Sequence, residues 1–160
     1  MIAPTTSTAA TIRPATPSDL PGVEKLLGAS DLPLAGVRDA LGDFVVAEAG
    51  GELVGVAGLE VCCDDALLRS VAVHPDWRSK GVGRALVSRA ISEAEARGIH
   101  ALYLLTTTAE HYFPSFGFKT ISRDEVPAAV RETDEFTKAC PASAAVMSRA
   151  VRGNAVGRAD

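Results

Sequence analysis

The sequence has little of several features that mark specialised classes of protein. Its 160 residues contain three cysteines and 5% aromatic residues. No apolar run approaches the roughly 20 residues that a membrane-spanning helix needs. The start of the chain lacks the cationic and apolar regions of a signal peptide. These absences argue against a disulfide scaffold and a membrane protein, so we expect a cytoplasmic chain with free thiols.

Positive charge and metal-ligand motifs are also scarce. The net charge is −4, whereas proteins that bind nucleic acid or an anionic membrane carry a basic patch. Cys-x-x-Cys and His-Glu-x-x-His spacings are absent, which argues against a metal site. Cys62 and Cys63 are adjacent in a predicted strand and would point to opposite faces of it. We therefore expect no nucleic-acid partner, no membrane partner and no metal.

The length is sufficient for one domain that buries about two thirds of its unfolded surface. Residues 1–10 and 152–160 are rich in small and polar residues without periodicity, and we predict mobile tails there. The folded domain should therefore occupy residues 11–151.

Hydrophobic periodicity predicts both strands and helices in this domain, and the three consecutive strands 44–49, 52–63 and 67–73 should form an antiparallel meander. Ser18 is expected to cap the first helix, and Gly50-Gly51 should form a tight turn between two strands. Because a long helix separates two buried strands, those strands should be parallel, which makes the sheet mixed. The predicted strands are 12–13, 44–49, 52–63, 67–73, 101–106, one that starts at 118, and 144–149. The predicted helices are 18–27, 34–41, 81–97, one from 108 or 109 to 116, and 128–136.

The most informative segment runs from Leu67 to Leu86. A buried strand is followed by a Pro-Asp-Trp break, a turn with two glycines and an amphipathic helix. The first amide groups of a helix have no intrahelical acceptor, and glycines let a ligand approach the backbone, so this turn suits a pyrophosphate. The predicted anion-binding residues are Arg78, Ser79, Lys80, Gly81, Val82 and Gly83, with Lys80 and Arg84 as charge partners.

Other phosphate-binding motifs do not fit this segment. No Gly-x-x-x-x-Gly-Lys-Ser/Thr sequence occurs, so a nucleotide-binding P-loop is excluded. The dinucleotide fingerprint lacks its third glycine and the acidic residue after the next strand. Coenzyme A (CoA) is the remaining candidate.

The sequence resembles the GCN5-related N-acetyltransferase (GNAT) superfamily over residues 11–151. The resemblance rests on Val71-x-Val73, Arg78-x-x-Gly81-x-Gly83, the long helix, the buried strand after it and Phe116-Gly117-Phe118. It implies an α/β (α+β) fold with a mixed sheet of about seven strands, in which parallel strands 4 and 5 splay apart. It also implies acetyl-CoA in that gap, flanking helices and, by analogy, a homodimer. The implied cofactor-binding residues outside the turn are Val71, Ala72, Val73 and Thr107.

A narrower resemblance is to the arsenic-resistance branch of that superfamily. Leu67-Leu68-Arg69-Ser70, the segment 104–110 and Cys140-Pro141 are similar to arsinothricin N-acetyltransferases, which are related to phosphinothricin acetyltransferases. The implied reaction is direct transfer of acetyl to the α-amino group of arsinothricin or a related glutamate mimic, which confers resistance.

The resemblance also implies catalytic groups. The backbone amide near Val71 would stabilise the thioester oxygen, and Glu60 or His111 could accept the proton of the amine. The tyrosine that serves as the acid in relatives falls here on Phe113. Tyr112 is the neighbouring alternative, although one helical step rotates a side chain by about 100°.

Arg69 is the main candidate for substrate recognition. It interrupts an apolar strand, and its guanidinium could hold a carboxylate or an arsinate with two hydrogen bonds. The alternative is that Arg69 pairs with Glu60 across the sheet. The further substrate-binding candidates are Phe44, Arg131 and Thr133, although an exposed helix face would also explain Arg131.

Two other functions remain open at this stage. The chain could acetylate a protein or another small amine, or it could be a non-catalytic acetyl-CoA sensor, which the replacement of tyrosine by Phe113 would suit. The sequence leaves open the true substrate, the proton acceptor, the proton donor and the oligomeric state.

Overall fold

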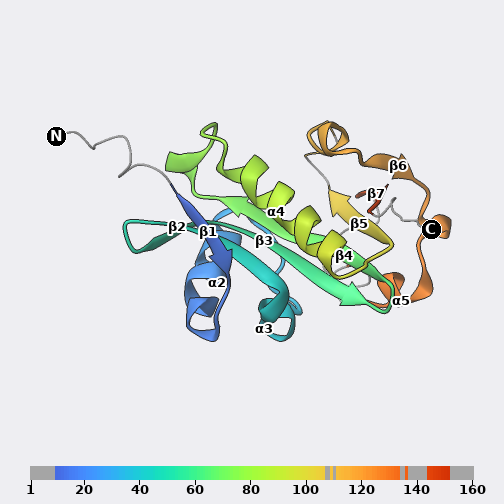
Figure 1. Ribbon diagram of the computed structural model, residues 1–160, viewed down its shortest axis with the longest axis horizontal. Helices are drawn as coiled ribbons and strands as arrows, with labels where there is room; N and C mark the ends of the chain where they lie inside the picture. The colour runs from blue at the N-terminus through green and yellow to red at the C-terminus, as the bar shows by residue number, and fades with distance from the viewer. Residues whose placement is uncertain (1–9, 107–108, 110, 134–135, 137–143, 152–160) are drawn as a thin grey trace. The chain divides into compact units, whose positions relative to one another are not determined.

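The computed structural model describes residues 10–106, 109, 111–133, 136 and 144–151 (Figure 1). The predicted tails, apart from Ala10, lie outside these residues, as does the cofactor candidate Thr107.

The described residues form a mixed sheet of seven strands in the order β1-β2-β3-β4-β5-β7-β6. The parallel pair is β4 with β5, while the β1–β2, β2–β3, β5–β7 and β6–β7 pairs are antiparallel. The predicted fold class is therefore confirmed. The strands are β1 (Thr11–Pro14), β2 (Phe44–Ala49), β3 (Glu52–Cys62), β4 (Asp65–Val73), β5 (Ala101–Thr106), β6 (Lys119–Ile121) and β7 (Ala145–Ala150).

The α-helices of the described chain are α2 (Leu20–Ala29), α3 (Val37–Ala40), α4 (Val82–Ala96) and α5 (Ala128–Arg131). None of them has the length and apolar character that crossing a membrane requires. Short 3₁₀ helices connect the other elements: η1 (Pro17–Asp19), η2 (Leu41–Asp43), η3 (Pro75–Trp77), η4 (Phe113–Phe116) and η5 (Arg123–Glu125).

Several predicted helices differ from the observed ones at their ends, and the one predicted over 34–41 is limited to Val37–Ala40 in α3. The first is capped by Thr16 and Asp19, not by Ser18, because the amide of Thr16 donates to Asp19 Oδ2 at 2.7 Å. The helix predicted up to Phe116 is reduced to η4, where Pro114 supplies no amide donor. The helix predicted over 128–136 ends at Arg131, because Thr133 Oγ1 donates to the carbonyl of Val130.

Contact density divides the chain into two compact units. The first comprises Met1–Gly58 with Ser70–Ala90, and the second comprises Leu59–Arg69 with Ile91–Asp160. In the first unit, alternate residues of β2 belong to different apolar clusters, as the two faces of a strand require. Phe44 and Val46 pack with α2 and α3, whereas Val45 and Ala47 pack with Val82 and Leu86 of α4. Figure 1 shows these helices on opposite sides of β2 and β3.

The turn between β2 and β3 follows the sequence prediction. Gly50 and Gly51 have φ of +59° and +83°, and Ala49 pairs with Glu52 across the turn. A two-residue turn with both residues left-handed matches the twist of the flanking strands. The β2–β3 hairpin therefore follows from local sequence.

The first unit also contains a partly buried ion-pair network around Arg13. Its guanidinium donates to both carboxylate oxygens of Asp19, at 2.8 and 3.0 Å, and its Nε donates to Glu48 at 2.9 Å. The hydrogen bond from Arg13 lowers the pKa of Asp19 to about 2. This network ties β1 to η1 and β2.

In the second unit, the parallel pairing of β4 with β5 is confined to Ala66 with Leu102 and Leu67 with Tyr103. The core of this unit gathers Leu67, Val126, Val130, Phe136 and Val146. The parallel arrangement that the crossover helix predicted is confirmed.

We expect Gly58→Ala to destabilise the protein by about 1–3 kcal/mol, which is typical of overpacking. A Cβ at Gly58 would lie 2.6 Å from Phe44 Cδ1 and closer still to Cε1 and Cζ of the same ring. Phe44 is 1% exposed, so its ring has little room to move. Urea denaturation followed by circular dichroism measures the change. Gly42→Ala is the matched control, because its Cβ would meet nothing within 4 Å. Equal midpoints for the two variants would contradict this prediction.

Candidate active site

The segment between β4 and α4 is fixed to the end of the sheet by hydrogen bonds. The amide of His74 donates to the carbonyl of Val54 at 2.8 Å, and the amide of Asp76 donates to His74 Nδ1 at 3.0 Å. Arg78 Nε donates to the carbonyl of Val73 at 3.1 Å. These hydrogen bonds therefore fix the start of the turn that follows η3 relative to β3 and β4.

The predicted anion-binding turn has the backbone geometry that such a site needs. Ser79 and Gly81 are left-handed, with φ of +65° and +86°, and α4 starts directly afterwards at Val82. A left-handed residue followed by a helical one turns consecutive amides toward the same point. Because α4 begins at Val82, the amides of Val82 and Gly83 have no acceptor four residues earlier within the helix. The structure thus brings the residues of the predicted turn together.

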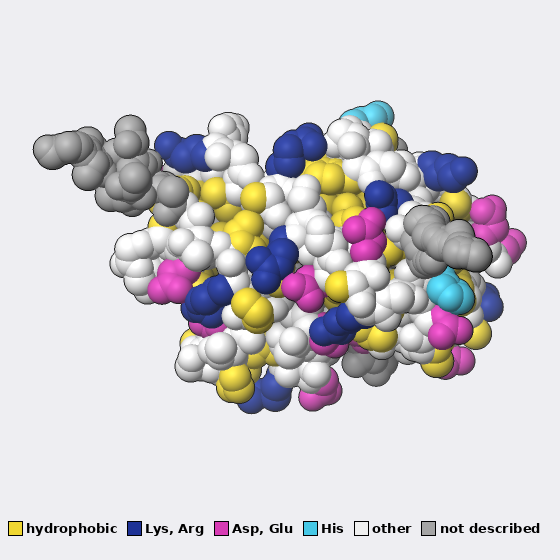
Figure 2. Space-filling model, viewed as in Figure 1, with side chains coloured by type: hydrophobic (Ala, Val, Ile, Leu, Met, Phe, Trp, Pro, Cys, Tyr) yellow, Lys and Arg dark blue, Asp and Glu magenta, His cyan; other side chains and the backbone are white. Residues whose placement is uncertain are grey.

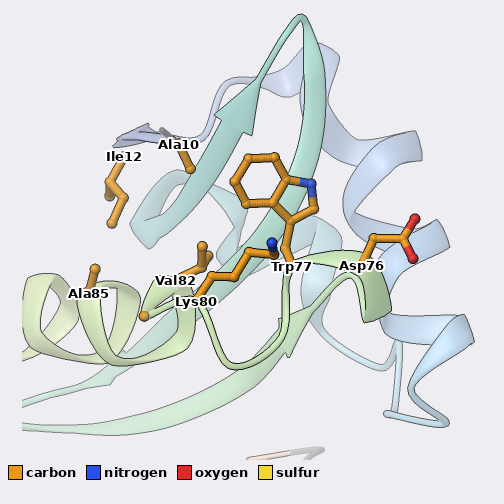
Figure 3. Close-up of a pocket in the computed structure, with 8 residues that line it drawn as sticks. Ala10, Ile12, Asp76, Trp77, Lys80, Val82 and Ala85 are labelled. Carbon is orange, nitrogen blue, oxygen red and sulfur yellow. The ribbon is translucent and has the colours of Figure 1, made fainter. Parts of the chain in front are cut away.

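A cavity of about 700 Å³ opens beside this turn (Figure 3). Figure 3 shows Ala10 and Ile12 across the hollow from Val82 and Ala85 of α4, with the ring of Trp77 at one end. Its full lining is Ala10, Ile12, Asp76, Trp77, Lys80, Gly81, Val82 and Ala85.

Trp77, the chain's single tryptophan, lines this cavity, whereas the sequence pattern predicts only that Pro75-Asp76-Trp77 breaks the preceding strand. The signal in the sequence is a large aromatic residue among the polar residues of a turn, which is typical of the wall of a binding cavity.

Two basic side chains, those of Lys80 and Arg84, lie at or next to the turn. Lys80 is exposed and lines the cavity, and Arg84 is exposed on the first turn of α4. On the face shown in Figure 2, basic and acidic side chains are interspersed. An anion held here would therefore rely mainly on backbone amides, with Lys80 as a cationic side chain that lines the cavity.

The segment Val71–Val73 follows a strained residue. Ser70 has φ of +60°, which is uncommon for a residue with a side chain and interrupts the regular alternation of the strand. Beyond Ser70, Val71 and Val73 pack on the cluster that contains α4, while Ala72 packs on the cluster that contains α2.

Arg69 forms an ion pair with Glu60, which was the alternative considered for it. Arg69 Nη1 lies 2.9 Å from Glu60 Oε1. Arg69 is 2% exposed, whereas the Glu60 side chain is 24% exposed. The carboxylate of Glu60 therefore pairs with a buried guanidinium while part of the Glu60 side chain remains exposed to solvent. A substrate-binding role for Arg69 and a proton-accepting role for Glu60 stay predictions.

Cys62 lies two residues beyond Glu60 and is a free thiol whose Sγ donates to the carbonyl of Glu60. Burial, together with the negative charge of Glu60, raises the pKa of Cys62 to about 11. A thiol of this kind stays protonated near neutral pH and is a poor nucleophile. Burial also raises the pKa of Asp65 and the pKa of Tyr103.

The aromatic residues before Gly117 form one cluster. The Tyr112 ring contacts Phe113 and Phe116 edge to face, with centroids 5.2 and 5.3 Å apart. Phe113 is buried against Phe118, whereas Tyr112 is 37% exposed. The position that carries the tyrosine in relatives is thus an inward-facing phenyl ring here. An acid role for Tyr112 stays a prediction.

The remaining candidates occupy varied environments. His111 and Arg131 are exposed, and Phe44 lies in the apolar core with α2. Thr133 is buried, and its Oγ1 both donates to the carbonyl of Val130 and accepts from the amide of Phe136. These two hydrogen bonds place Thr133 at the C-terminal end of α5. Across the described residues, no group of three or more His, Cys, Asp or Glu side chains could hold a metal ion.

Comparison with known proteins identifies the family. A model described as an acetyltransferase (GNAT) domain matches residues 40–120, which is about half of the chain. An amino-acid acetyltransferase of Aeromonas salmonicida is 31% identical over 86 residues, covering 52% of this chain and 20% of that protein. The chain thus spans about a fifth of the curated relatives it matches.

Two solved structures share the fold. N-acetylglutamate synthase from Neisseria gonorrhoeae, complexed with coenzyme A and N-acetyl-glutamate, aligns with a TM-score of 0.78 and 25% identity, covering 91% of this chain and 36% of that one. A Mycobacterium tuberculosis protein in complex with CoA and NLQ aligns with a TM-score of 0.76 and 25% identity, covering 89% and 99%. The family match covers the β2–β3 hairpin, β4, the turn from Arg78 to Gly83, α4 and β5, and so this chain belongs to the GNAT acetyltransferase family.

Proposed function

We propose that this chain transfers acetyl from acetyl-CoA to the α-amino group of an acidic amino acid, and that arsinothricin or a related glutamate mimic is its substrate. The observation that carries the proposal is the pair of left-handed residues, Ser79 and Gly81, that opens α4. Amides aimed at one point at a helix start bind phosphate groups. The amino-acid acetyltransferases among the relatives support the choice of acceptor.

The residues of the first unit bind and orient acetyl-CoA in this proposal. The amides of Gly81, Val82 and Gly83 hold the diphosphate, and Lys80 contributes charge. The segment Val71–Val73 lies along the pantetheine arm, and the Val71 amide stabilises the negative charge that develops on the thioester oxygen.

Other residues would bind and deprotonate the acceptor. Arg69 binds a carboxylate or arsinate group of the substrate, and Glu60 or His111 accepts the proton of the attacking amine. The new C–N bond forms as the C–S bond breaks, and the departing thiolate takes a proton from Tyr112 or water. The raised pKa of Cys62, about 11, argues against an acyl group on this thiol, which is consistent with direct transfer.

L-Glutamate is the second candidate acceptor. It is favoured by the likeness to N-acetylglutamate synthase, whose structure contains N-acetyl-glutamate. Arsinothricin is a glutamate mimic, so one binding site could accept either compound. A cytoplasmic homodimer is part of the proposal by analogy with the superfamily, and light scattering after gel filtration tests it.

The test is a thiol-release assay with acetyl-CoA and a panel of acceptors. We expect turnover on arsinothricin, weaker turnover on phosphinothricin and a measurable rate on L-glutamate if it shares the site. The fluorescence of Trp77, the single tryptophan, reports CoA binding independently. Binding without thiol release on any acceptor would support a sensor, and turnover only on peptide amines would support a protein acetyltransferase.

A further inference from the structure

Gly55 of β3 lies directly beneath the start of α4. A Cβ at this position would lie 2.7 Å from Leu86 Cδ1, 3.1 Å from Val82 Cγ1 and 3.4 Å from the carbonyl oxygen of Ala72. Two of these atoms belong to the first turns of α4, and the third belongs to the backbone of β4. Because Gly55 has no side chain, Leu86 and Val82 of α4 can pack directly against β3 at this position.

The neighbours of Gly55 have little freedom to move aside. Leu86 is 0% exposed and Val82 is 7% exposed, and both belong to the apolar cluster on the α4 side of β2 and β3. Val82 is β-branched, so its χ1 angle is restricted in a helix. Packed side chains transmit a displacement instead of absorbing it. A methyl group at Gly55 would therefore push the first turn of α4 away from β3.

Val82 links this packing contact to the anion-binding turn. Its side chain rests on Gly55, while its backbone amide is the first of α4 and follows Gly81. Hydrogen bonds to an oxygen require a donor–acceptor distance of about 2.7–3.2 Å, so a shift of a few tenths of an ångström weakens them. The depth of α4 on the sheet thus sets where the amides of the turn point.

We infer that Gly55 is a positioning residue for acetyl-CoA: by having no side chain, it sets the height of Val82 above β3 and hence the geometry of the phosphate-binding amides. This inference rests on the proposed function, because it assumes that the diphosphate lies on this turn. Gly55 itself does not contact acetyl-CoA.

The first test is Gly55→Ala. We expect the KM for acetyl-CoA, and its Kd from Trp77 fluorescence, to rise about tenfold, because a small misplacement of binding groups weakens several hydrogen bonds together. The KM for the amino-acid acceptor should change less than about twofold, since a general loss of folded protein lowers the apparent kcat and leaves both KM values unchanged. Gly28→Ala in α2 is the matched control, because its Cβ would meet nothing within 4 Å.

The second test relieves the contact. Leu86→Val removes the δ-carbons, one of which approaches a Cβ at Gly55 most closely, so the Gly55→Ala/Leu86→Val variant should regain acetyl-CoA affinity relative to Gly55→Ala. Val82→Ile enlarges the same contact from the helix side with Gly55 intact, and it should raise the KM for acetyl-CoA. This variant decides the matter if Gly55→Ala folds poorly.

The outcomes distinguish failure of the inference about Gly55 from failure of the proposed function. Wild-type acetyl-CoA affinity in both Gly55→Ala and Val82→Ile would overturn the inference, because Leu86 and its neighbours would then have absorbed the methyl group. Failure of the unmodified protein to bind CoA would instead overturn the proposed function. A selective rise in the KM for acetyl-CoA, reversed by Leu86→Val, would support both.

Discussion

Gly81→Val is expected to raise the KM for acetyl-CoA by about 100-fold or more, which corresponds to losing about two charge-assisted hydrogen bonds of roughly 1.5–3 kcal/mol each. Gly81 has φ of +86°, a conformation that a β-branched residue does not adopt without strain. No atom lies within 4 Å of its would-be Cβ, so the effect arises from the backbone and not from crowding. The turn must rearrange, and its amides then no longer converge.

Steady-state kinetics at saturating acceptor and Trp77 fluorescence both measure this effect. Gly98→Val is a matched control, because Gly98 follows the other end of α4, has φ of +73° and also has nothing near its would-be Cβ. Both variants should lose some stability from backbone strain. An equal change of acetyl-CoA affinity in the two variants would mean that the start of α4 is not the phosphate site.

Arg69→Ala is expected to lower kcat/KM for the acidic acceptor by about 100-fold or more, as the loss of a bidentate contact to a carboxylate predicts. Stability should fall as well, since removing one partner of a buried ion pair costs about 3–5 kcal/mol. The loss should lie toward the lower end of that range, because Glu60 is 24% exposed and can be hydrated.

The ratio of two acceptors distinguishes substrate binding from structural support. If Arg69 binds the side-chain carboxylate, Arg69→Ala should remove the preference for L-glutamate over L-glutamine. Arg13→Ala is the control, because Arg13 likewise forms ion pairs, with the carboxylates of Asp19 and Glu48. It should lower the urea midpoint while the ratio stays unchanged. A ratio that also stays unchanged in Arg69→Ala would remove Arg69 from substrate recognition.

Much of the fold could be predicted because its determinants are local. The Gly50-Gly51 hairpin, the apolar stripe of α4 and the turn from Arg78 to Gly83 are each specified by residues within a few positions of one another. Helix ends were less predictable. The cap at Thr16 depends on Asp19, which in turn is held by Arg13 of β1.

Some features of the candidate site could likewise be predicted from the sequence, and others could not. The sequence by itself determined the glycine turn from Arg78 to Gly83 and the parallel relation of β4 to β5, because glycines, periodicity and the length of a crossover act over short stretches of chain. Only the tertiary structure decided that Glu60 meets Arg69, that Phe113 turns inward while Tyr112 stays at the surface, and that Gly55 bears the first turn of α4. These facts depend on which side chains meet after the chain has folded. Van der Waals contact and ion pairing act over a few ångströms in space, and such distances cannot be read from positions along a chain.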